Sequence, residues 1–324
     1  MGIEIRRKKE PPAGLTSCRA SPIVGSDCKP LRGSPPEEMK PVTFLMMAIV
    51  SSASMTLAMK ALRGQRGNRF ALILGNYLMC IALSFAFLPD KALLWQGSPL
   101  TPGLGLAGGA VFVAGLISMQ SSIRVNGATL SAAFAKLGLL VPLGVGILCF
   151  GERPGFLQLC GIALVFPAIL LINRGDGGED KAENPALLAL TLVCCGSGDA
   201  MAKIFEQLGT SREDALFFFW LFLTAALISA ALAVRERQRT GKRMLPAEFG
   251  AGILLGIPNY FSSFLLLKAL ATVPSFAAYP LYSTGTLLLV TAVSALFFGE
   301  KPGKRQRLGL LLILAALALL APGA

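Results

Sequence analysis

Ten long apolar runs fill the chain after residue 39, and they decide what it can fold into. They cover 42–60, 70–88, 103–120, 128–149, 156–173, 185–205, 214–234, 247–269, 275–298 and 308–322. Most reach the roughly 17–25 residues that a helix needs to cross a bilayer. They are continuous, whereas strands of a membrane barrel alternate and run for only about 10 residues. Because lipid offers no partners to free backbone groups, the sequence predicts an all-α transmembrane fold.

The composition agrees with a membrane protein and narrows its chemistry. Apolar residues make up 54% of the chain and charged residues 15%, against about 45–50% and about 25% in soluble domains. The chain has no histidine, which excludes Ser-His-Asp and Cys-His sites and most zinc chemistry. We therefore expect no enzyme activity, no metal site and no cofactor. The net charge of +12 is expected to set membrane topology beside anionic lipid rather than to bind nucleic acid.

Residues 1–38 differ from the rest of the chain. They are rich in Pro, Ser, Gly and charge and contain no apolar run, so they are neither a signal peptide nor a packed domain. We interpret them as a disordered N-terminal extension. Met39 stands directly before the first apolar run, so translation starting at Met39 is an alternative interpretation.

The strongest internal signal is a repeat at an offset of 148 residues. Residues 150–161 read FGERPGFLQLCG, and residues 298–309 read FGEKPGKRQRLG. The identical pairs are Phe150/Phe298, Gly151/Gly299, Glu152/Glu300, Pro154/Pro302, Gly155/Gly303, Gln158/Gln306 and Gly161/Gly309. Seven identities in twelve positions are far above chance.

A second match supports the same division of the chain. The pattern Gly105-x-x-x-Gly109 recurs as Gly252-x-x-x-Gly256, at an offset of 147 residues. The sequence thus predicts two copies of one five-helix unit, over 39–174 and 184–322. Because five is odd, the second copy enters the membrane from the opposite side. Such inverted repeats are chiefly a transporter architecture, with the substrate site near the midplane between the halves.

These residues resemble a known family. Ten helices arranged as five plus five, each half carrying Phe-Gly-Glu, a Pro-Gly turn and Gln-x-x-Gly, are similar to the EamA-like branch of the drug/metabolite transporter superfamily. Pro142 in the fourth run also fits that family, whereas Val290 occupies the corresponding place in the ninth. The resemblance covers about residues 40–322. It implies a secondary transporter in the plasma membrane, expected to be bacterial, that moves a small polar or amphipathic metabolite or drug by alternating access.

Lys136 is the first candidate for the site, because it lies nine residues into the fourth apolar run. A lysine near the bilayer midplane costs about 2.5–3.5 kcal/mol on insertion scales, so it should face a cavity or a partner. It would receive an anionic substrate group or exchange a proton. The alternative is a structural role, in which the amine snorkels or pairs with Asp199.

Asp199 is the only carboxylate within the ten runs apart from their ends. Lys203 follows it by four residues, a spacing that places the two side chains on one helix face. We expect the two charges to neutralise each other, and proton or sodium binding by Asp199 is the alternative. Any proton coupling has to use Asp199, Lys136, Glu152 or Glu300, because the chain has no imidazole.

Further polar and aromatic residues lie within the runs. Amides and hydroxyls in lipid usually serve contacts between helices, and some line pockets. We place in the candidate cavity, beside Lys136 and Asp199, the residues Asn76, Asn259, Tyr260 and Tyr279. The repeated motif is instead expected to be structural, forming the turn after each fourth helix, with Arg153 or Lys301 offsetting the carboxylate. Its residues are Gly151, Glu152, Pro154, Gly299, Glu300 and Pro302.

Three questions stay open at this level. The GxxxG patterns are expected to pack within each repeat, with dimerisation as the alternative, so the chain is a monomer or a homodimer in the membrane lipid.

The five loops on one side carry 15 Lys and Arg, which places both termini outside by the positive-inside rule, whereas the family resemblance implies cytoplasmic termini. The rival functions are a non-transporting sensor or scaffold and a membrane-embedded enzyme.

Overall fold

The computed structural model describes residues 41–61, 69–173, 183–241, 245–297 and 303–320, and within these ranges it contains helices and no strand. The expected all-α fold is therefore confirmed. The helices are α1 (Pro41–Ala61), α2 (Arg69–Ala86), α3 (Leu93–Gln96), α4 (Leu100–Asn126), α5 (Ala128–Leu137), α6 (Leu140–Leu148), α7 (Phe156–Asn173), α8 (Pro185–Leu208), the 3-10 turn η1 (Ser211–Glu213), α9 (Asp214–Thr240), α10 (Pro246–Leu270), α11 (Ser275–Phe297) and α12 (Lys304–Leu320). Residues 1–38, Gly299, Glu300 and Pro302 lie outside the described residues.

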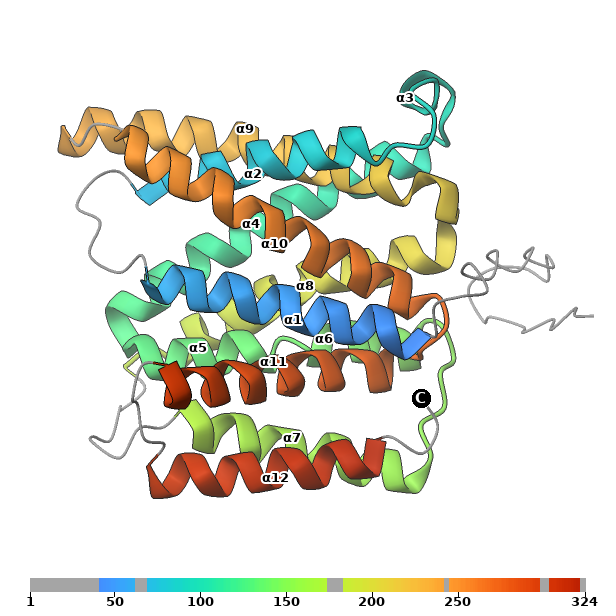
Figure 1. The fold of residues 1–324 in the computed structure, drawn as a ribbon, viewed down its shortest axis with the longest axis vertical. Coiled ribbons are helices and arrows are strands. Elements are labelled where there is room, and N and C mark those ends of the chain that lie inside the picture. The colour runs from blue at the N-terminus through green and yellow to red at the C-terminus, as the bar shows by residue number, and fades with distance from the viewer. Residues whose placement is uncertain (1–40, 62–68, 174–182, 242–244, 298–302, 321–324) are drawn as a thin grey trace, which may run out of the picture.

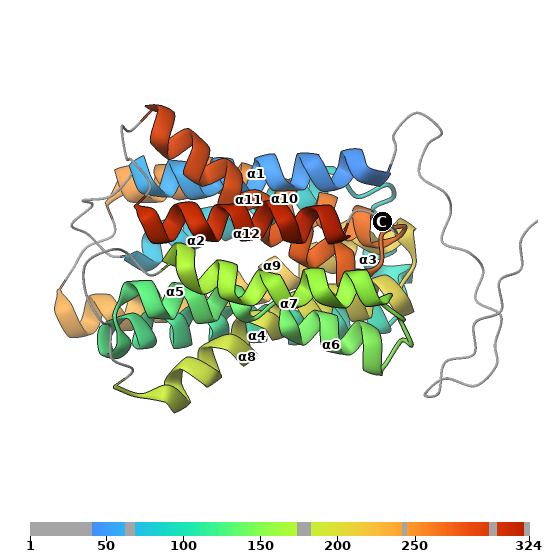
Figure 2. The ribbon, with the colours of Figure 1, turned by 90° about the horizontal axis from the view of Figure 1, so that it is seen from below.

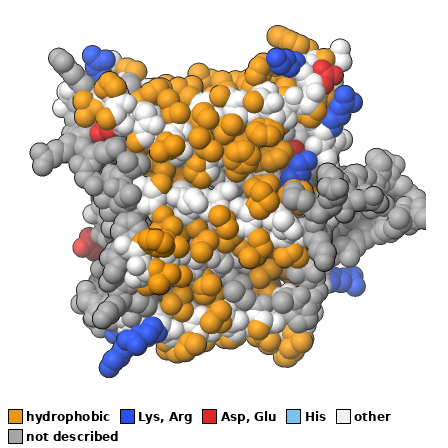
Figure 3. All heavy atoms as spheres, in the orientation of Figure 1, with side chains coloured by type: hydrophobic (Ala, Val, Ile, Leu, Met, Phe, Trp, Pro, Cys, Tyr) orange, Lys and Arg blue, Asp and Glu red, His pale blue; other side chains and the backbone are white. Residues whose placement is uncertain are grey.

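In the part of the chain that the structure describes, seven segments are long and apolar enough to cross a membrane. They comprise α1, α4, the combined α5 and α6, α8, η1 with α9, α10 and α11. Two shorter apolar helices, Phe70–Ala86 and Phe156–Leu171, belong to α2 and α7. Figure 3 shows apolar side chains across the middle of one face and the charged ones toward its two ends. This distribution fits a multi-pass membrane protein; ten spans in an inverted repeat stay a prediction.

The helices run side by side in a bundle whose ends carry the loops (Figures 1 and 2). Helices α7 and α12 pack together at one edge, and α2 and α9 pack together at the other. Between these edges α4 packs on α8, and α10 packs on α1. We call the side on which α1 begins and α12 ends the terminal side. The α6–α7 connection, the end of α8 and the start of α11 lie on this side (Figure 1).

The fourth apolar run forms two helices separated by a tight right-handed turn, called the helix break below, which corrects the expectation of one helix over 128–149. Helix α5 ends at Leu137, and α6 begins at Leu140. Pro142 has no N–H to donate to the carbonyl of Gly138, four residues before it. That carbonyl accepts instead from the amide of Val141 at 2.9 Å, in a tighter turn. The break is packed directly against α8, because a Cβ atom at Gly196 would lie 2.1 Å from the oxygen of Gly138.

The two GxxxG patterns connect the two halves of the chain, which corrects the expectation that they pack within each repeat. Gly105 and Gly109 of α4 meet the backbone of α9. Gly252 and Gly256 of α10 meet the backbone of α2. A Cβ atom would lie 2.3 Å from the oxygen of Leu221 at Gly109 and 2.1 Å from that of Leu72 at Gly252. Small residues thus let helices from different halves cross at backbone contact.

This close crossing predicts a sharp difference between two neighbouring glycines of α10. Gly252→Ala forces α10 away from Leu72, and overpacking of this kind costs about 1–3 kcal/mol. Gly250→Ala is the matched control, because no heavy atom lies within 4 Å of its added Cβ. We expect a lower melting temperature for Gly252→Ala alone when both proteins are unfolded thermally in detergent. Equal melting temperatures would show that this crossing is not tight.

Candidate functional site

Lys136 and Asp199 approach each other from different halves of the chain. Lys136 lies in the last turn of α5, beside the helix break, and Asp199 lies on α8, which packs against α5 and α6. The two charges interact electrostatically, yet no ion pair within 4.0 Å joins them among the described residues. Both residues are half-buried. A cation and an anion deep in an apolar bundle are thus neighbours without neutralising each other directly.

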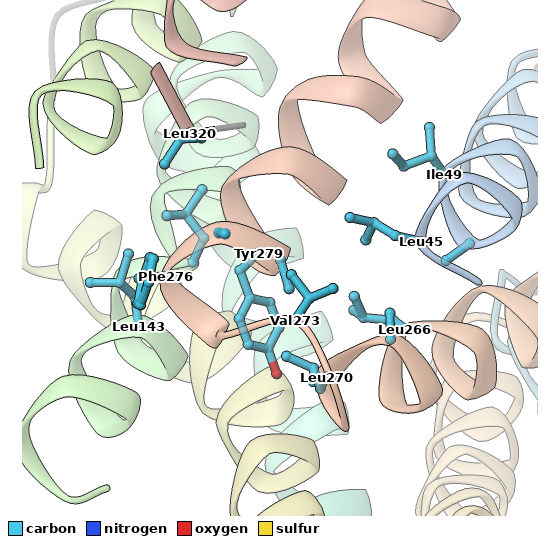
Figure 4. Packing of buried hydrophobic residues seen from close by; sticks show 14 of the residues in the cluster. Leu45, Ile49, Leu143, Leu266, Leu270, Val273, Phe276, Tyr279 and Leu320 are labelled. Atoms are coloured by element: carbon cyan, nitrogen blue, oxygen red, sulfur yellow. The ribbon is translucent and has the colours of Figure 1, made fainter. Parts of the chain in front are cut away.

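Hydroxyl groups from three further helices surround this pair. The Tyr279 hydroxyl on α11 donates to the backbone oxygen of Asp199 at 2.8 Å, and Figure 4 shows it directed toward α8. The Tyr282 hydroxyl, one turn further along α11, lies 2.5 Å from that of Ser262 on α10. Tyr282 also bonds to Ser52 of α1 and interacts electrostatically with Asp199. These side chains form one polar cluster, called the central cluster below: Ser52, Lys136, Asp199, Ser262, Tyr279 and Tyr282.

The other three predicted cavity residues lie elsewhere. Tyr260 is fully buried among aromatic rings, stacked on Phe87 and Phe264, and its hydroxyl has no hydrogen-bond partner among the described residues. Asn259 donates to the side-chain oxygen of Asn76 at 2.7 Å, which ties α10 to α2 where their backbones cross. The structure therefore joins Lys136, Asp199 and Tyr279, but it does not bring Asn76, Asn259 or Tyr260 to them.

Lys203 does not pair with Asp199, which corrects the expectation from their spacing. Its ammonium lies 2.8 Å from a Glu152 oxygen and 3.0 Å from a Glu206 oxygen. The Lys203 side chain is only 1% exposed. One buried cation thus serves two carboxylates, and this leaves Asp199 to face Lys136. We call Glu152, Lys203, Glu206 and Ser275 the terminal cluster, because the segments that hold them meet on the terminal side.

Glu152 contacts the second half of the chain rather than only closing a local turn. Gly151 has a φ of +67°, a conformation that glycine adopts readily, and the Glu152 amide then bonds back to the Gly146 oxygen at 3.0 Å. Its carboxylate accepts from the Ser275 hydroxyl at 2.6 Å and from the Ser275 and Phe276 amides at 3.1 and 3.3 Å. A negative charge is favoured at such a helix start. Lys203, rather than the expected Arg153, balances Glu152.

These contacts set the protonation of Glu152. Burial alone raises the pKa of the carboxyl, but the Lys203 charge and the Ser275 donors outweigh burial and hold the pKa below its usual range. The ionised form therefore stabilises the fold above the unfolded-state pKa of about 4.3. This contribution is lost as the pH falls through the lower pKa of the folded state.

The sign of this shift predicts a pH-dependent stability. The melting temperature of the wild type should fall on acidification below about pH 4.3, and Glu152→Gln should lack this component because glutamine does not titrate. Thermal unfolding in detergent between neutral and acid pH measures both proteins, and their difference isolates Glu152 from other carboxylates. Parallel profiles would contradict the assignment.

The Pro-Gly-x-x-Gln part of the repeat caps a helix in both copies. The Gln158 side chain accepts from the Gly155 amide at 2.6 Å, at the start of α7. The Gln306 side chain accepts from the Gly303 amide at 3.1 Å, at the start of α12. Both are the reciprocal half of a capping box, which supplies a partner to an amide that the helix cannot pair. Pro154 precedes the first of these caps.

Sequence reasoning missed two members of the terminal cluster. Glu206 lies three residues after Lys203, and this spacing favours an ion pair as well as the four-residue spacing of Asp199 does. The sequence therefore offered Lys203 two carboxylate partners of equal quality. Ser275 carries no such signal, because its contact with Glu152 spans 123 residues. Within the described ranges, no group of three His, Cys, Asp or Glu side chains is placed to hold a metal ion.

The fold and its buried charges define a multi-pass, all-helical membrane protein, and comparisons with known proteins identify its class. A sequence model of the EamA-like transporter family matches residues 185–321. This match spans most of the second half of the chain, and it supports placing the protein in the drug/metabolite transporter superfamily. A solved structure, titled only as the crystal structure of a protein, has a TM-score of 0.67 and 14% identity; the alignment covers 87% of this chain and 97% of that one. At this identity it shows a shared fold alone. No curated protein matches the chain.

Proposed function

We propose that the chain forms ten membrane-spanning segments in two inverted repeats, over residues 39–174 and 184–322. The packing supports this, because it is nearly unchanged when the halves are exchanged. Helix α4 packs on α8 and α9, and α10 packs on the equivalents α1 and α2. Helix α6 packs on α8 as α11 packs on α1. Helices α2 and α9 are equivalent to each other and pack together, and the same holds for α7 and α12, so these contacts are unchanged by the exchange. Equivalent contacts on both sides of one axis are typical of a duplicated, inverted unit.

The proposed function is secondary transport of a small polar or amphipathic solute by alternating access. The observation that carries it is the arrangement of Lys136 and Asp199. These opposite charges lie on helices from different halves, beside a broken helix, without a direct ion pair. Intramembrane ionisable residues are functional candidates by default, and transporters built from inverted repeats hold their substrate near the midplane, at the interface between the repeats. A rocking motion of the halves would expose this cluster to each side in turn.

The same arrangement supports a coupling role for the pair. Asp199 supplies a carboxylate at the centre of the bundle, so a proton or a sodium ion is the coupling ion that we propose. The protein would act in a plasma membrane, which we propose to be bacterial. The central cluster would then hold solute and ion on neighbouring side chains.

A ligand screen tests this function. Purified protein in detergent is heated with each of a panel of metabolites, because a ligand that binds only the folded state raises the apparent stability. We expect at least one polar metabolite to raise the melting temperature of the wild type and to lose this effect in Lys136→Met. Stabilisation that is unaffected in Lys136→Met would place the binding site elsewhere.

A further inference from the structure

The terminal cluster lies where the two halves meet. Glu152 belongs to the first half, in the connection between α6 and α7, whereas Lys203, Glu206 and Ser275 belong to the second. All four residues are less than 10% exposed. Their segments lie on the terminal side of the bundle (Figure 1). Opening a path from this side to the central cluster would separate Glu152 from its partners.

The two carboxylates that pair with Lys203 differ in whether they move with it. Glu206 is on the same helix, three residues further on, so the Lys203–Glu206 pair stays together when α8 moves as a rigid body. The Lys203–Glu152 pair joins different halves and breaks when they part. A buried charge that loses all its partners is strongly destabilising. Glu206 therefore keeps Lys203 paired in both arrangements.

From this geometry we propose that the Lys203–Glu152 ion pair is an ionic latch, meaning an interaction that keeps the two halves together on the terminal side. The latch opens when this pair separates, and Glu206 then keeps Lys203 charge-paired. The inference rests on the proposed transport function, because it assigns a step of the alternating-access cycle. Glu152 also holds the start of α11 through the Ser275 and Phe276 amides. Release of the latch would thus free α11, which carries Tyr279 and Tyr282 of the central cluster.

The two carboxylates then have opposite effects on opening. Glu152→Gln removes the charge that holds the halves together, so the open arrangement gains population. Glu206→Gln leaves the closed latch with its ion pair to Glu152, but Lys203 would be unpaired once the latch opens, so the open arrangement loses population. A merely structural cluster predicts the same direction for both substitutions, because each removes one buried ion pair from the same lysine.

Cys195 is a native reporter for this test. It lies on α8 eight residues before Lys203, or about 12 Å deeper along the helix, and it interacts electrostatically with Asp199 and Lys136. In full-length protein that retains only this cysteine, a membrane-impermeant thiol reagent is added to vesicles from one side. The terminal side is the side from which a cysteine introduced by Trp95→Cys reacts, because Trp95 is 92% exposed on α3, which lies on that side.

We expect Glu152→Gln to label Cys195 about tenfold faster than the parent, and Glu206→Gln to label it about tenfold more slowly, a factor that corresponds to about 1.4 kcal/mol each. Asp90→Asn is the matched control, because it removes an exposed carboxylate between α2 and α3 and should leave the rate unchanged. Ser275→Ala keeps every charge and should give a smaller acceleration; it replaces Glu152→Gln if that protein does not fold. The latch would be overturned if both glutamate variants changed the labelling rate in the same direction, or if neither variant changed it.

Labelling needs no solute, so the experiment can contradict the latch without contradicting the transport function, and the reverse. Opposite changes in labelling without any solute flux would retain the latch as a gate and remove the proposed function. Flux in the wild type with equal labelling in all variants would retain transport and remove the latch. Monodisperse elution of each variant shows that it has folded.

Discussion

Lys136→Met is expected to abolish solute transport while leaving the protein folded and inserted. Methionine has a similar length and no charge, so the helix loses the insertion cost of about 2.5–3.5 kcal/mol that a lysine carries near the midplane. A hydrogen bond to a charged group contributes about 1.5–3 kcal/mol, so loss of the cation should weaken solute binding by about 10-fold to 150-fold. The measurement is solute flux into proteoliposomes of equal protein content.

Two further variants separate a functional role of Lys136 from a structural one. Lys304→Met removes an exposed lysine at the start of α12 and should retain full flux. The double variant Lys136→Met with Asp199→Asn removes both charges. If the pair only balances charge, the double variant should regain transport; if the two side chains bind solute or ion, it should stay inactive. Wild-type flux in Lys136→Met would remove this lysine from the site.

Gly196→Ala carries the second large expected effect. The added Cβ would lie 2.1 Å from the Gly138 oxygen and 2.7 Å from a methyl group of Val141, so α8 and the α5–α6 break must move apart. Overpacking of this kind costs about 1–3 kcal/mol. The displacement also shifts Lys136, two residues before Gly138, relative to Asp199. We therefore expect both a lower melting temperature and a strong loss of flux.

Gly144→Ala is the control for this substitution. Gly144 lies in α6, and no heavy atom lies within 4 Å of its added Cβ, so stability and flux should stay near those of the wild type. Thermal unfolding in detergent and proteoliposome flux measure the two effects on the same preparations. A Gly196→Ala protein that melts and transports like the wild type would show that the contact between α8 and the helix break is not needed.

Hydropathy predicted the helices well because each run is governed by a local requirement. A backbone in lipid must pair its own polar groups, and an apolar run of this length has only the helix to do so. The fourth run is one span, as its continuous apolar character predicts. The break at Gly138 within it has an equally local cause, the missing amide of Pro142, which continuous hydropathy does not show. The capping role of Gln158 and Gln306 can also be predicted from the sequence, since a capping box needs only a four-residue window.

Partners across the bundle were less accessible to sequence reasoning. The spacing of Asp199 and Lys203 indicated a pair, and Glu206 offered Lys203 a spacing of the same quality, so helical periodicity could not choose between them. The deciding contact is with Glu152, which is distant in sequence and comes from the other half. The glycines of α4 and α10 show the same limit: the pattern predicted close crossing but not the crossing partner. Side-chain chemistry was predictable where the partner is local, and topology decided the rest.

Solute counterflow is a direct measurement of transport through the site between Lys136 and Asp199. Proteoliposomes are loaded with a high concentration of an unlabelled metabolite that stabilises the protein, and then diluted into a trace of the labelled compound. We expect transient accumulation of label by the wild type, and no accumulation by Lys136→Met or by protein-free liposomes. A metabolite that binds at Lys136 yet gives no counterflow in the wild type would contradict transport and favour a sensor or scaffold.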